Sequence, residues 1–449
     1  MITLDAITQL GSSIKEKLFS ELGSHDELIR IEIPISKILF HDLLFCSKAS
    51  TLFYLKNVSS NEERLALGLC KSWEYKCEDY QFSEKDLSPY IEMGVPLYSS
   101  VLFQSLDKNK DDLWNSLAGM TYVIPAIELI KLENKITLRC FCPVSVIKNQ
   151  ENLDAYISAA LAVDLEPITT EFSITNQTMT PDYENWESSI NKILELIKTS
   201  SLKKLILARK TTFEVTNKNA IIALLKEGLS KEKGSNIYYQ KINSSKAFLA
   251  ITPENLFVRK ETIITCDAIA GTTNIGKTDS QTTDLASTLL SNKKNCAEHD
   301  VVVDYLNTEL SSLCDSVTLV KEKEILKLSY IQHIHSVVQG VLKEGVTDFD
   351  LLQVLHPTPA TGGSPKDTIK LIKEFESFNR GLYAGAIGII SKDYSAFLVG
   401  IRSCLMQDMN LHVFSGAGIV NGSNPHEEWE ELNIKMKSYI TYNNLNIDE

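Results

Sequence analysis

The second half of the chain carries short segments in which apolar residues alternate with polar ones or form brief runs, as β-strands do. These segments are residues 204–209, 236–242, 247–251, 256–259, 262–269, 384–391, 395–406 and 410–415. Several of them are separated by only a few turn residues, which favours antiparallel hairpins over parallel strands with helical crossovers. The pattern therefore predicts an antiparallel sheet.

Helical periodicity appears between and around these strands. The apolar residues Ile190, Ile193 and Ile197 share one face of a helix that we expect over residues 188–199. A longer helical stretch is expected over residues 284–315, and another helix closes the chain. Together the segments predict an α+β fold, with large antiparallel β-sheets and helices packed outside.

Residues 1–180 mix short apolar runs with helix-like stretches such as residues 59–74. The apolar runs span residues 31–40, 51–56 and 136–147. A polar, turn-rich segment at residues 175–186 is the one candidate boundary. We expect residues 1–180 to be an N-terminal α+β part of the same fold, followed by a second region from residue 187.

Charge narrows the functional classes. The chain has 449 residues, with 45 Lys and Arg against 58 Asp and Glu, so its formal net charge is −13. Nucleic-acid binding depends mostly on clustered Lys and Arg, so this balance disfavours a nucleic-acid partner. With 43% hydrophobic and 23% charged residues the composition is that of an ordinary globular protein. The functional classes that remain are an enzyme acting on a small molecule and a protein-binding domain.

The nine cysteines are odd in number and scattered, and the sequence contains no CxxC pair. We therefore expect reduced thiols in a cytoplasmic protein. The N-terminus lacks the basic and apolar regions of a signal peptide, and no run approaches the roughly 18 apolar residues of a membrane span. We expect a soluble monomer or weak homodimer without a membrane partner.

Residues 271–278, GTTNIGKT, match the phosphate-binding pattern GxxxxGK[ST], which on its own suggests a P-loop nucleotide hydrolase. Three features argue against this function. No helical periodicity begins directly after Lys277, although the phosphate-binding mechanism needs a helix there. Residues 301–304, which could imitate the magnesium-binding strand, have a helical period instead. The surrounding strands are predicted to be hairpins rather than a parallel sheet.

The last third of the chain carries stronger chemical signals. On the helix that closes the chain, Glu428, Glu431 and Lys435 fall on one face. Just upstream, Gly416 and Gly418 offer backbone N–H groups that suit a carboxylate ligand. Carboxylates, a lysine and accessible amides together indicate a binding site at the start of this helix.

The segment HPTPATGG at residues 356–363 has two prolines that fix its backbone and two glycines that permit close approach, more than a turn requires. With seven other segments in matching order, it resembles the chorismate-utilising enzymes, and the isochorismate synthases in particular. These segments are KLILAR at 204–209, ITPENLF at 251–257, AIAGT at 268–272, KKNCAEHDVVV at 293–303, LYAGAIG at 382–388, IRS at 401–403 and SGAGIVNGSNPHEEWEELNIK at 415–435. The resemblance spans residues 187–439 and implies that residues 187–445 are the chorismate-binding catalytic region of that fold.

The resemblance implies an isochorismate synthase, in which water adds at C2 of the chorismate ring while the C4 hydroxyl leaves. Lys204 matches the family's general base and Glu254 matches its general acid. An enclosed site favours the neutral form of a lysine, which water activation needs. Burial likewise favours a protonated carboxyl, which can donate to the leaving group.

Mg²⁺ is the cofactor that the resemblance implies. Glu298 and Glu431 match the family's magnesium ligands, and Glu428 fits as an outer carboxylate that orients a bound water. Lys435, near the same face, would balance their charge.

Arg402 matches the residue that grips the side-chain carboxylate of chorismate, where a planar guanidinium can bind two oxygens. The other residues that the resemblance assigns to substrate binding are Tyr383, Thr272, Gly416, Gly418, His333, Ala360 and Lys435. Tyr383 and the two glycine amides would join Arg402, and Thr272 would hydrogen-bond near the ring carboxylate. His333 matches a histidine at the pyruvyl end, although it could instead belong to the core.

Two positions favour water as the nucleophile. Amine-adding relatives have glutamine in place of Lys204, and aminodeoxychorismate synthases commonly have a lysine in place of Ala270. Salicylate synthases share the base and the acid and then eliminate pyruvate, so they remain the closest alternative. Residues 53–57 and 62–68 look like the menaquinone-type branch, which favours a pure isochorismate synthase that feeds menaquinone biosynthesis. A binding protein without turnover would lose the base, the acid or a metal ligand, and none is lost.

Overall fold

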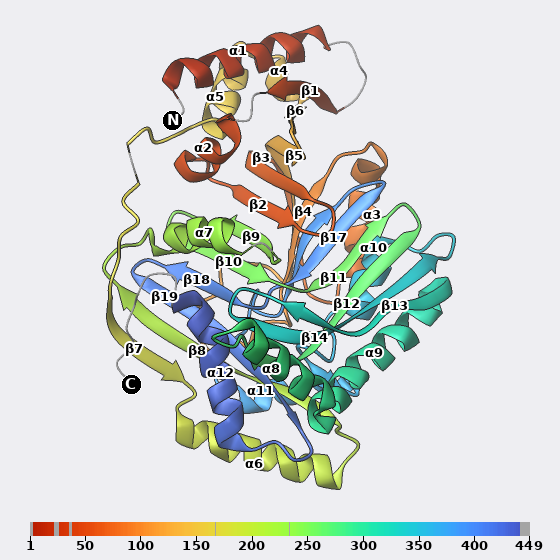
Figure 1. The fold of residues 1–449 in the computed structure, drawn as a ribbon. Coiled ribbons are helices and arrows are strands. Elements are labelled where there is room, and N and C mark those ends of the chain that lie inside the picture. The colour runs from red at the N-terminus through yellow and green to blue at the C-terminus, as the bar shows by residue number, and fades with distance from the viewer. Residues whose placement is uncertain (1–2, 22–26, 36–37, 167, 233, 441–449) are drawn as a thin grey trace.

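The computed structural model describes residues 3–21, 27–35, 38–166, 168–232 and 234–440 (Figure 1). The end of the predicted catalytic region, residue 445, lies outside these ranges. The helices are α1 Leu4–Ser20, α2 Ile38–Cys46, α3 Tyr80–Glu92, α4 Val144–Ile147, α5 Gln150–Ala160, α6 Tyr183–Thr199, α7 Ala220–Lys231, α8 Asp279–Ser291, α9 Lys293–Leu313, α10 Asp348–Leu355, the 3₁₀ helix Lys366–Leu371, α11 Ile372–Phe375 and α12 Pro425–Ile440.

The strands of the first half are β1 Leu28–Ile35, β2 Leu52–Asn57, β3 Glu62–Tyr75, β4 Leu97–Val101, β5 Met120–Leu132, β6 Lys135–Pro143 and β7 Ile174–Thr180. Those of the second half are β8 Lys204–Val215, β9 Asn236–Lys241, β10 Lys246–Thr252, β11 Asn255–Lys260, β12 Ile263–Asn274, β13 Cys314–Lys327, β14 Ile331–Leu342, β15 Gly363–Ser364, β16 Ala386–Ile390, β17 Tyr394–Val399, β18 Ser403–Gln407 and β19 Asn410–Val420.

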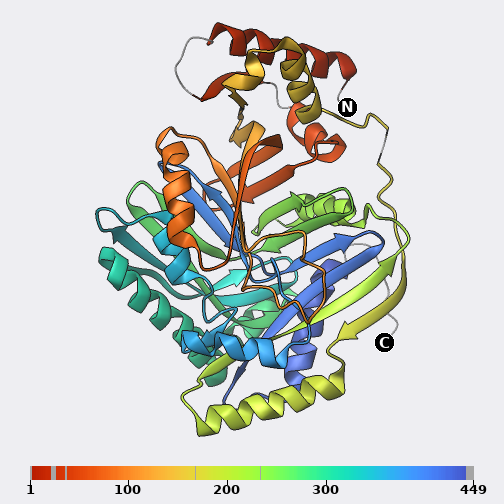
Figure 2. The ribbon, with the colours of Figure 1, turned by 180° about the vertical axis from the view of Figure 1, so that it is seen from behind.

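The nineteen described strands are hydrogen-bonded into one sheet, and all the pairings between them are antiparallel. Strands fill the middle of the molecule, and helices such as α3, α6, α9 and α12 lie around them (Figures 1 and 2). The predicted α+β architecture, with large antiparallel sheets and helices packed outside, is confirmed.

The two halves of the chain share this sheet. Strand β2 pairs with β9, and β4 pairs with β16, so strands from the first 180 residues lie directly beside strands of the second half. The turn-rich segment 175–186 is not a linker without structure, because it contains most of β7, which pairs with β8. The boundary between the two predicted regions stays a prediction.

The helix-like interpretation of residues 59–74 is wrong, since these residues form most of β3. The surroundings override the helix preference of these residue types, because residues 64–68 in the middle of β3 are buried on both faces of the sheet. Leu65 and Leu67 pack into one hydrophobic core, whereas Ala66 between them packs into another. A short apolar run that is buried on both faces has no alternation to distinguish a strand from a helix.

The predicted strands of the second half are all present, although β8 and β12 run past their predicted ends to Val215 and Asn274, and strands β13, β14 and β15 were not predicted. Three further segments differ in detail. The stretch 395–406 is two strands, β17 and β18, because the chain turns at Arg402, whose φ is +46°. Strand β19 runs to Val420, five residues beyond the predicted 410–415. The helix predicted over 284–315 is two helices, because the side chain of Asn292 accepts a hydrogen bond from the backbone of Asn295 and caps α9.

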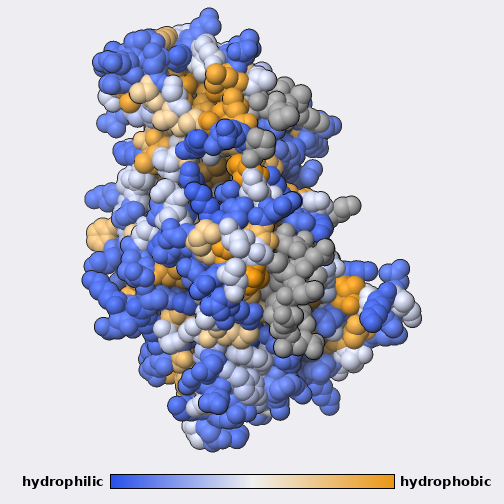
Figure 3. All heavy atoms as spheres, turned by 90° about the vertical axis from the view of Figure 1, so that its left-hand side faces the viewer, coloured by the Kyte–Doolittle hydropathy of each residue, from blue (hydrophilic) through white to orange (hydrophobic). Residues whose placement is uncertain are grey.

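Hydrophilic side chains cover most of the face in Figure 3, and hydrophobic atoms gather in smaller groups between them. Among the described residues, no helix is both long enough and apolar enough to cross a membrane.

Candidate active site

One cavity brings together almost all of the predicted site residues. It contains about 760 Å³ of space between its lining atoms, open mouth included. It is lined by Ile206, Pro253, Glu254, Ile269, Ala270, Gly271, Thr272, Glu298, His333, Ala360, Thr361, Tyr383, Ile401, Arg402, Phe414, Ser415, Gly416, Gly418, Glu431 and Lys435. Of the predicted site residues, only Lys204 and Glu428 are absent from this lining.

Lys204 lies just behind the lining. It is the first residue of β8, it is fully buried, and its Nζ is 2.9 Å from Oε1 of Glu298. Gly418 leaves the space for this contact, because a Cβ there would lie 2.3 Å from Glu298 Oε1 and 3.1 Å from Lys204 Cε. The predicted base therefore contacts a predicted metal ligand rather than facing the cavity directly.

Glu254 occupies the turn between β10 and β11 and points into the cavity. Its backbone N–H donates to Thr252 Oγ1 (3.3 Å), and its carbonyl oxygen accepts from Val399 N (3.1 Å). The side chain is 1% exposed, and among the described residues its Oε1 has no hydrogen-bond partner. Burial, together with the charge of Asp267 and against that of Lys204, raises the pKa of Glu254 to about 8. The carboxyl is thus protonated near neutral pH, as a proton donor requires.

Helices α9 and α12 present the acidic residues of the cavity. Lys435 Nζ lies 2.7 Å from Glu431 Oε1 and donates to the carbonyl oxygen of Gly416 (2.8 Å). The Asn424 side chain accepts hydrogen bonds from the backbone of the first turn of α12. Burial tends to raise the pKa of Glu298, but the charges of Lys204, Lys435 and Lys294, with the hydrogen bond from Lys204, together outweigh it and lower that pKa. Glu298 is therefore a carboxylate at neutral pH.

Glu428 is turned to a different partner. Its Oε1 accepts a hydrogen bond from Lys294 Nζ at 2.6 Å. The negative charges of Glu428, Glu431 and Glu298 all raise the pKa of Lys294. Carboxylate oxygens are ligands that suit Mg²⁺. The three carboxylates also already interact with one cation, the ammonium group of Lys294. Among the described residues, no three acidic, His or Cys side chains are close enough together to enclose a metal ion. A bound Mg²⁺ would therefore need oxygens from water or substrate besides these carboxylates.

The opposite side of the cavity carries Arg402, at the turn between β17 and β18. Its Nη2 contacts Nε2 of His333, and Nδ1 of His333 lies 3.1 Å from Thr272 Oγ1 and 3.2 Å from the carbonyl oxygen of Gly271. Burial and the charge of Arg402 hold the pKa of His333 well below its usual range. A neutral His333 can donate through Nδ1 and accept from Arg402 through Nε2, so it orients the guanidinium. The alternative that His333 is only a core residue is not supported, because it lines the cavity.

Tyr383 and the two glycines of β19 shape the wall between these sides. The Tyr383 ring stacks on Phe414, with 5.3 Å between ring centroids. Gly416 and Gly418 lie inside β19, opposite Ala208 and Ile206 of β8. A Cβ at Gly416 would come within 2.5 Å of the Tyr383 hydroxyl oxygen, so the absence of side chains at both glycines makes room for cavity residues.

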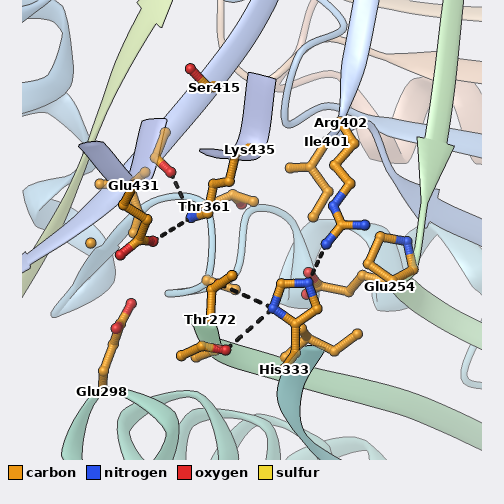
Figure 4. Close-up of a pocket in the computed structure, with 18 of the residues that line it drawn as sticks. Glu254, Thr272, Glu298, His333, Thr361, Ile401, Arg402, Ser415, Glu431 and Lys435 are labelled. Atoms are coloured by element: carbon orange, nitrogen blue, oxygen red, sulfur yellow. Dashed lines mark hydrogen bonds and ion pairs between the residues drawn. The ribbon is translucent and has the colours of Figure 1, made fainter. Parts of the chain in front are cut away.

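Figure 4 shows the resulting arrangement: Glu298 and Glu431 lie on one side, and Arg402, His333 and Glu254 lie on the other. Such a site can hold a small molecule with negative groups at two ends. One end would meet Arg402, and the other would meet the carboxylates through a cation.

The GTTNIGKT segment does not form a phosphate cradle. Its first residues lie in β12, whose partners β11 and β14 are antiparallel, and residues 301–304 lie in α9, as predicted. The expectation that no helix follows is wrong, because α8 begins at Asp279 with Thr278 as its cap. The amides of Gly276 and Lys277 donate to side chains of α8, Thr282 Oγ1 and Gln281 Oε1, instead of being available to a ligand.

Sequence reasoning did not single out several lining residues. These are Ile206, Pro253, Ile269, Gly271, Thr361, Ile401, Phe414 and Ser415. All but Phe414 lie inside one of the quoted segments, and Phe414 directly precedes the last of them. Alternation along β8, β12 and β19 could have found those that share a strand face with Lys204, Thr272 and Gly418.

Comparison with known proteins points to the same family that the sequence segments resemble. The chain matches the model of the family described as chorismate binding enzyme over residues 19–442. It is 30% identical over 446 residues to isochorismate synthase MenF of Haemophilus influenzae, which covers 97% of this chain and 96% of that protein. It is 26% identical to isochorismate synthase MenF of Escherichia coli, over 98% and 99% of the two chains.

Two solved structures share the fold. The menaquinone-specific isochorismate synthase MenF from Escherichia coli superposes with a TM-score of 0.83 at 23% sequence identity, covering 96% of this chain and 99% of that one. Anthranilate synthase component I from Streptococcus pneumoniae gives a TM-score of 0.61 at 20% identity, covering 93% of each chain.

Proposed function

Because the chain belongs to the chorismate-binding enzyme family, we propose that it is an isochorismate synthase. It converts chorismate to isochorismate by adding water at C2 of the ring while the C4 hydroxyl leaves. The observation that carries this proposal is Glu254, a buried carboxyl that is protonated at neutral pH, lines the cavity and lies within electrostatic reach of the buried Lys204. An acid and a base at one cavity are what the exchange of two hydroxyl groups needs.

Each residue has a defined part in the reaction. Arg402, oriented by His333, binds the side-chain carboxylate of chorismate and fixes the position of the ring. Lys204, in its deprotonated form, accepts a proton from the attacking water as its oxygen bonds to C2. Glu254 gives its proton to the C4 oxygen as that carbon–oxygen bond breaks, and the ring double bonds shift between the two carbons. One water is consumed and one is released, so the reaction is an isomerisation.

We also propose that Mg²⁺ is required, with Glu298 and Glu431 as its protein ligands and Glu428 as an outer carboxylate. When bound, the cation supplies positive charge that neutralises the ring carboxylate of the substrate. Glu298 is the residue that links this part of the site to the base, since its Oε1 contacts Lys204. Thr272 hydrogen-bonds near the same carboxylate, and Lys435 holds Glu431.

The product feeds menaquinone biosynthesis, in this proposal. It is supported by the isochorismate synthase MenF relatives, two of which match along nearly the whole chain. The described cysteines are all free thiols, which suits a reducing compartment, so we infer a cytoplasmic location.

The test of this function is a product analysis by chromatography after incubation of the purified protein with chorismate and Mg²⁺. Isochorismate in equilibrium with chorismate is the expected result. Salicylate with pyruvate would instead make the protein a salicylate synthase. Unchanged chorismate in the same assay, with phosphate released from an ATP control, would favour a nucleotide hydrolase.

A further inference from the structure

Behind the cavity, the side chain of Asp267 on β12 makes three polar contacts with residues of two other strands, β11 and β14. Its Oδ2 accepts from the backbone N–H of Asn255 at 3.0 Å and from Asn255 Nδ2 at 2.6 Å. Its Oδ1 lies 2.8 Å from Nε2 of His335 on β14, which donates to it. Asp267 is 11% exposed and His335 is 13% exposed, and neither residue lines the cavity.

These contacts fix the residue that follows Glu254. Asn255 is held from a second direction by Asn57, whose Nδ2 donates to Asn255 Oδ1 at 2.9 Å. Glu254 therefore stands on a turn whose next residue is clamped on both sides, by β12 and by the end of β2. Rigid placement of an acid relative to its substrate is a large part of general acid catalysis.

The charges that face Glu254 come from several elements. Asp267 on β12 raises the pKa of Glu254, whereas Lys204 on β8 lowers it. Arg402, on the β17–β18 turn, and His333, on β14, line the same cavity. A second carboxylate near a buried carboxyl disfavours loss of its proton. The His335 contact holds the Asp267 side chain in place next to the turn that carries Glu254.

We propose that Asp267, held by His335, is a positioning residue for the general acid: it anchors the turn that carries Glu254 and keeps the proton on Glu254 until the leaving group takes it. This inference rests on the proposed role of Glu254 as the acid. It assigns Asp267 no contact with substrate, and it makes the pair Asp267–His335 a determinant of the pH range in which the enzyme works.

The test is an infrared titration of the Glu254 carboxyl in the full-length protein without substrate. The carbonyl band of the protonated carboxyl is assigned by its loss in Glu254→Gln, and its pH midpoint is followed. In Asp267→Asn, whose amide oxygen can still accept from Asn255 while its amide nitrogen faces His335, the midpoint is expected to fall by on the order of one pH unit. Asp267→Glu, which keeps the charge, is expected to retain the wild-type midpoint.

Two further variants keep this test decisive. Asp267→Ser, a smaller neutral residue, replaces Asp267→Asn if the latter does not fold, and the same fall is expected. Asp154→Asn removes a carboxylate that pairs with Lys15 far from the cavity and is the control, with an unchanged midpoint. An unchanged midpoint in any folded neutral variant at 267 would overturn the proposal.

The kinetic readout separates positioning from general damage. In the Asp267→Asn variant, the fall of kcat/KM at high pH is expected to begin at lower pH, with activity near the wild-type level at about pH 6 and several-fold lower at about pH 8. Equal loss at every pH would mean a merely structural role and would contradict the proposal. Because the infrared midpoint needs no substrate, it tests the Asp267–Glu254 coupling even if chorismate proves not to be the substrate.

Discussion

Nζ of Lys204 lies 2.9 Å from Oε1 of Glu298 in the protein interior, at a point where Gly418 supplies no side chain. This contact joins the residue proposed to activate water to a residue proposed to bind the metal. The base and the metal site are therefore one structural unit on β8, α9 and β19. A substitution of Lys204 is therefore expected to affect metal binding, and a substitution of Glu298 is expected to affect the proton affinity of Lys204.

Lys204→Ala is expected to lower kcat by roughly 10²- to 10⁴-fold, because the proton of the attacking water would have no acceptor. Chorismate binding should persist, since Arg402 and the rest of the lining remain. Turnover assays combined with a binding measurement by calorimetry check this. Lys203→Ala, which changes the exposed neighbour, is the matched control. Near-normal turnover in Lys204→Ala would remove it as the base.

Glu431→Gln is expected to raise steeply the magnesium concentration needed for activity, because an amide is a weaker ligand for Mg²⁺ than a carboxylate. The measurement is a titration of activity and of calorimetric binding with Mg²⁺. Glu427→Gln on the same helix, at an exposed position, is the control and should leave the titration unchanged. The same curve for Glu431→Gln and wild type would exclude Glu431 as a ligand.

The pH dependence follows from Glu254. Its pKa is raised from 4.5 to about 8, so the proton-donating form is present below about pH 8 and kcat/KM should fall as the pH rises through that value. The folded state binds this proton more tightly than the unfolded state does, so the group's contribution to stability decreases between about pH 4.5 and 8.

Glu254→Gln should remove both effects. Activity would be lost at every pH, and the melting temperature of the variant should fall less than that of the wild type as the pH rises. Melting curves at several pH values measure the second effect without substrate. Parallel pH dependences for the two proteins would show that Glu254 is not protonated in the folded state.

Arg402→Lys is expected to raise KM for chorismate by on the order of tenfold while kcat changes less, because an ammonium cannot reproduce the two-oxygen contact of a guanidinium. Steady-state kinetics of the variant at saturating Mg²⁺ give both values. Arg30→Lys, at an exposed position in the N-terminal part, is the control. A fall in kcat with unchanged KM would place Arg402 in the chemical step instead.

The strand pattern of the second half predicted most of the sheet correctly, because hairpin strands that are polar on one side show their period in the sequence. Strands β13 and β14 were nevertheless missed. Two other failures occur where this period is absent. Residues 59–74 were misassigned because Leu65, Ala66 and Leu67 are buried on both faces of the sheet. The break between α8 and α9 depends on one side-chain cap at Asn292, which apolar periodicity cannot show.

The site was predicted largely through quoted segments that resemble a family, and the structure brings the residues of those segments to one cavity. What the sequence could not show is how the residues contact one another. The contact of Lys204 with Glu298 depends on space left by Gly418 on another strand, and Glu428 contacts Lys294 instead of the cavity. The Asp267–His335 pair was not visible either, since it arises only when β12 and β14 lie side by side.

The most direct test of the proposed reaction uses water labelled with heavy oxygen. Purified protein, chorismate and Mg²⁺ are incubated in this water, and the masses of the separated products are measured by mass spectrometry. The Glu254→Gln variant is the inactive control. The account predicts isochorismate whose new ring hydroxyl carries solvent oxygen, and label that appears in chorismate only as the reaction reverses. Isochorismate without solvent oxygen, or salicylate and pyruvate as the accumulating products, would contradict it.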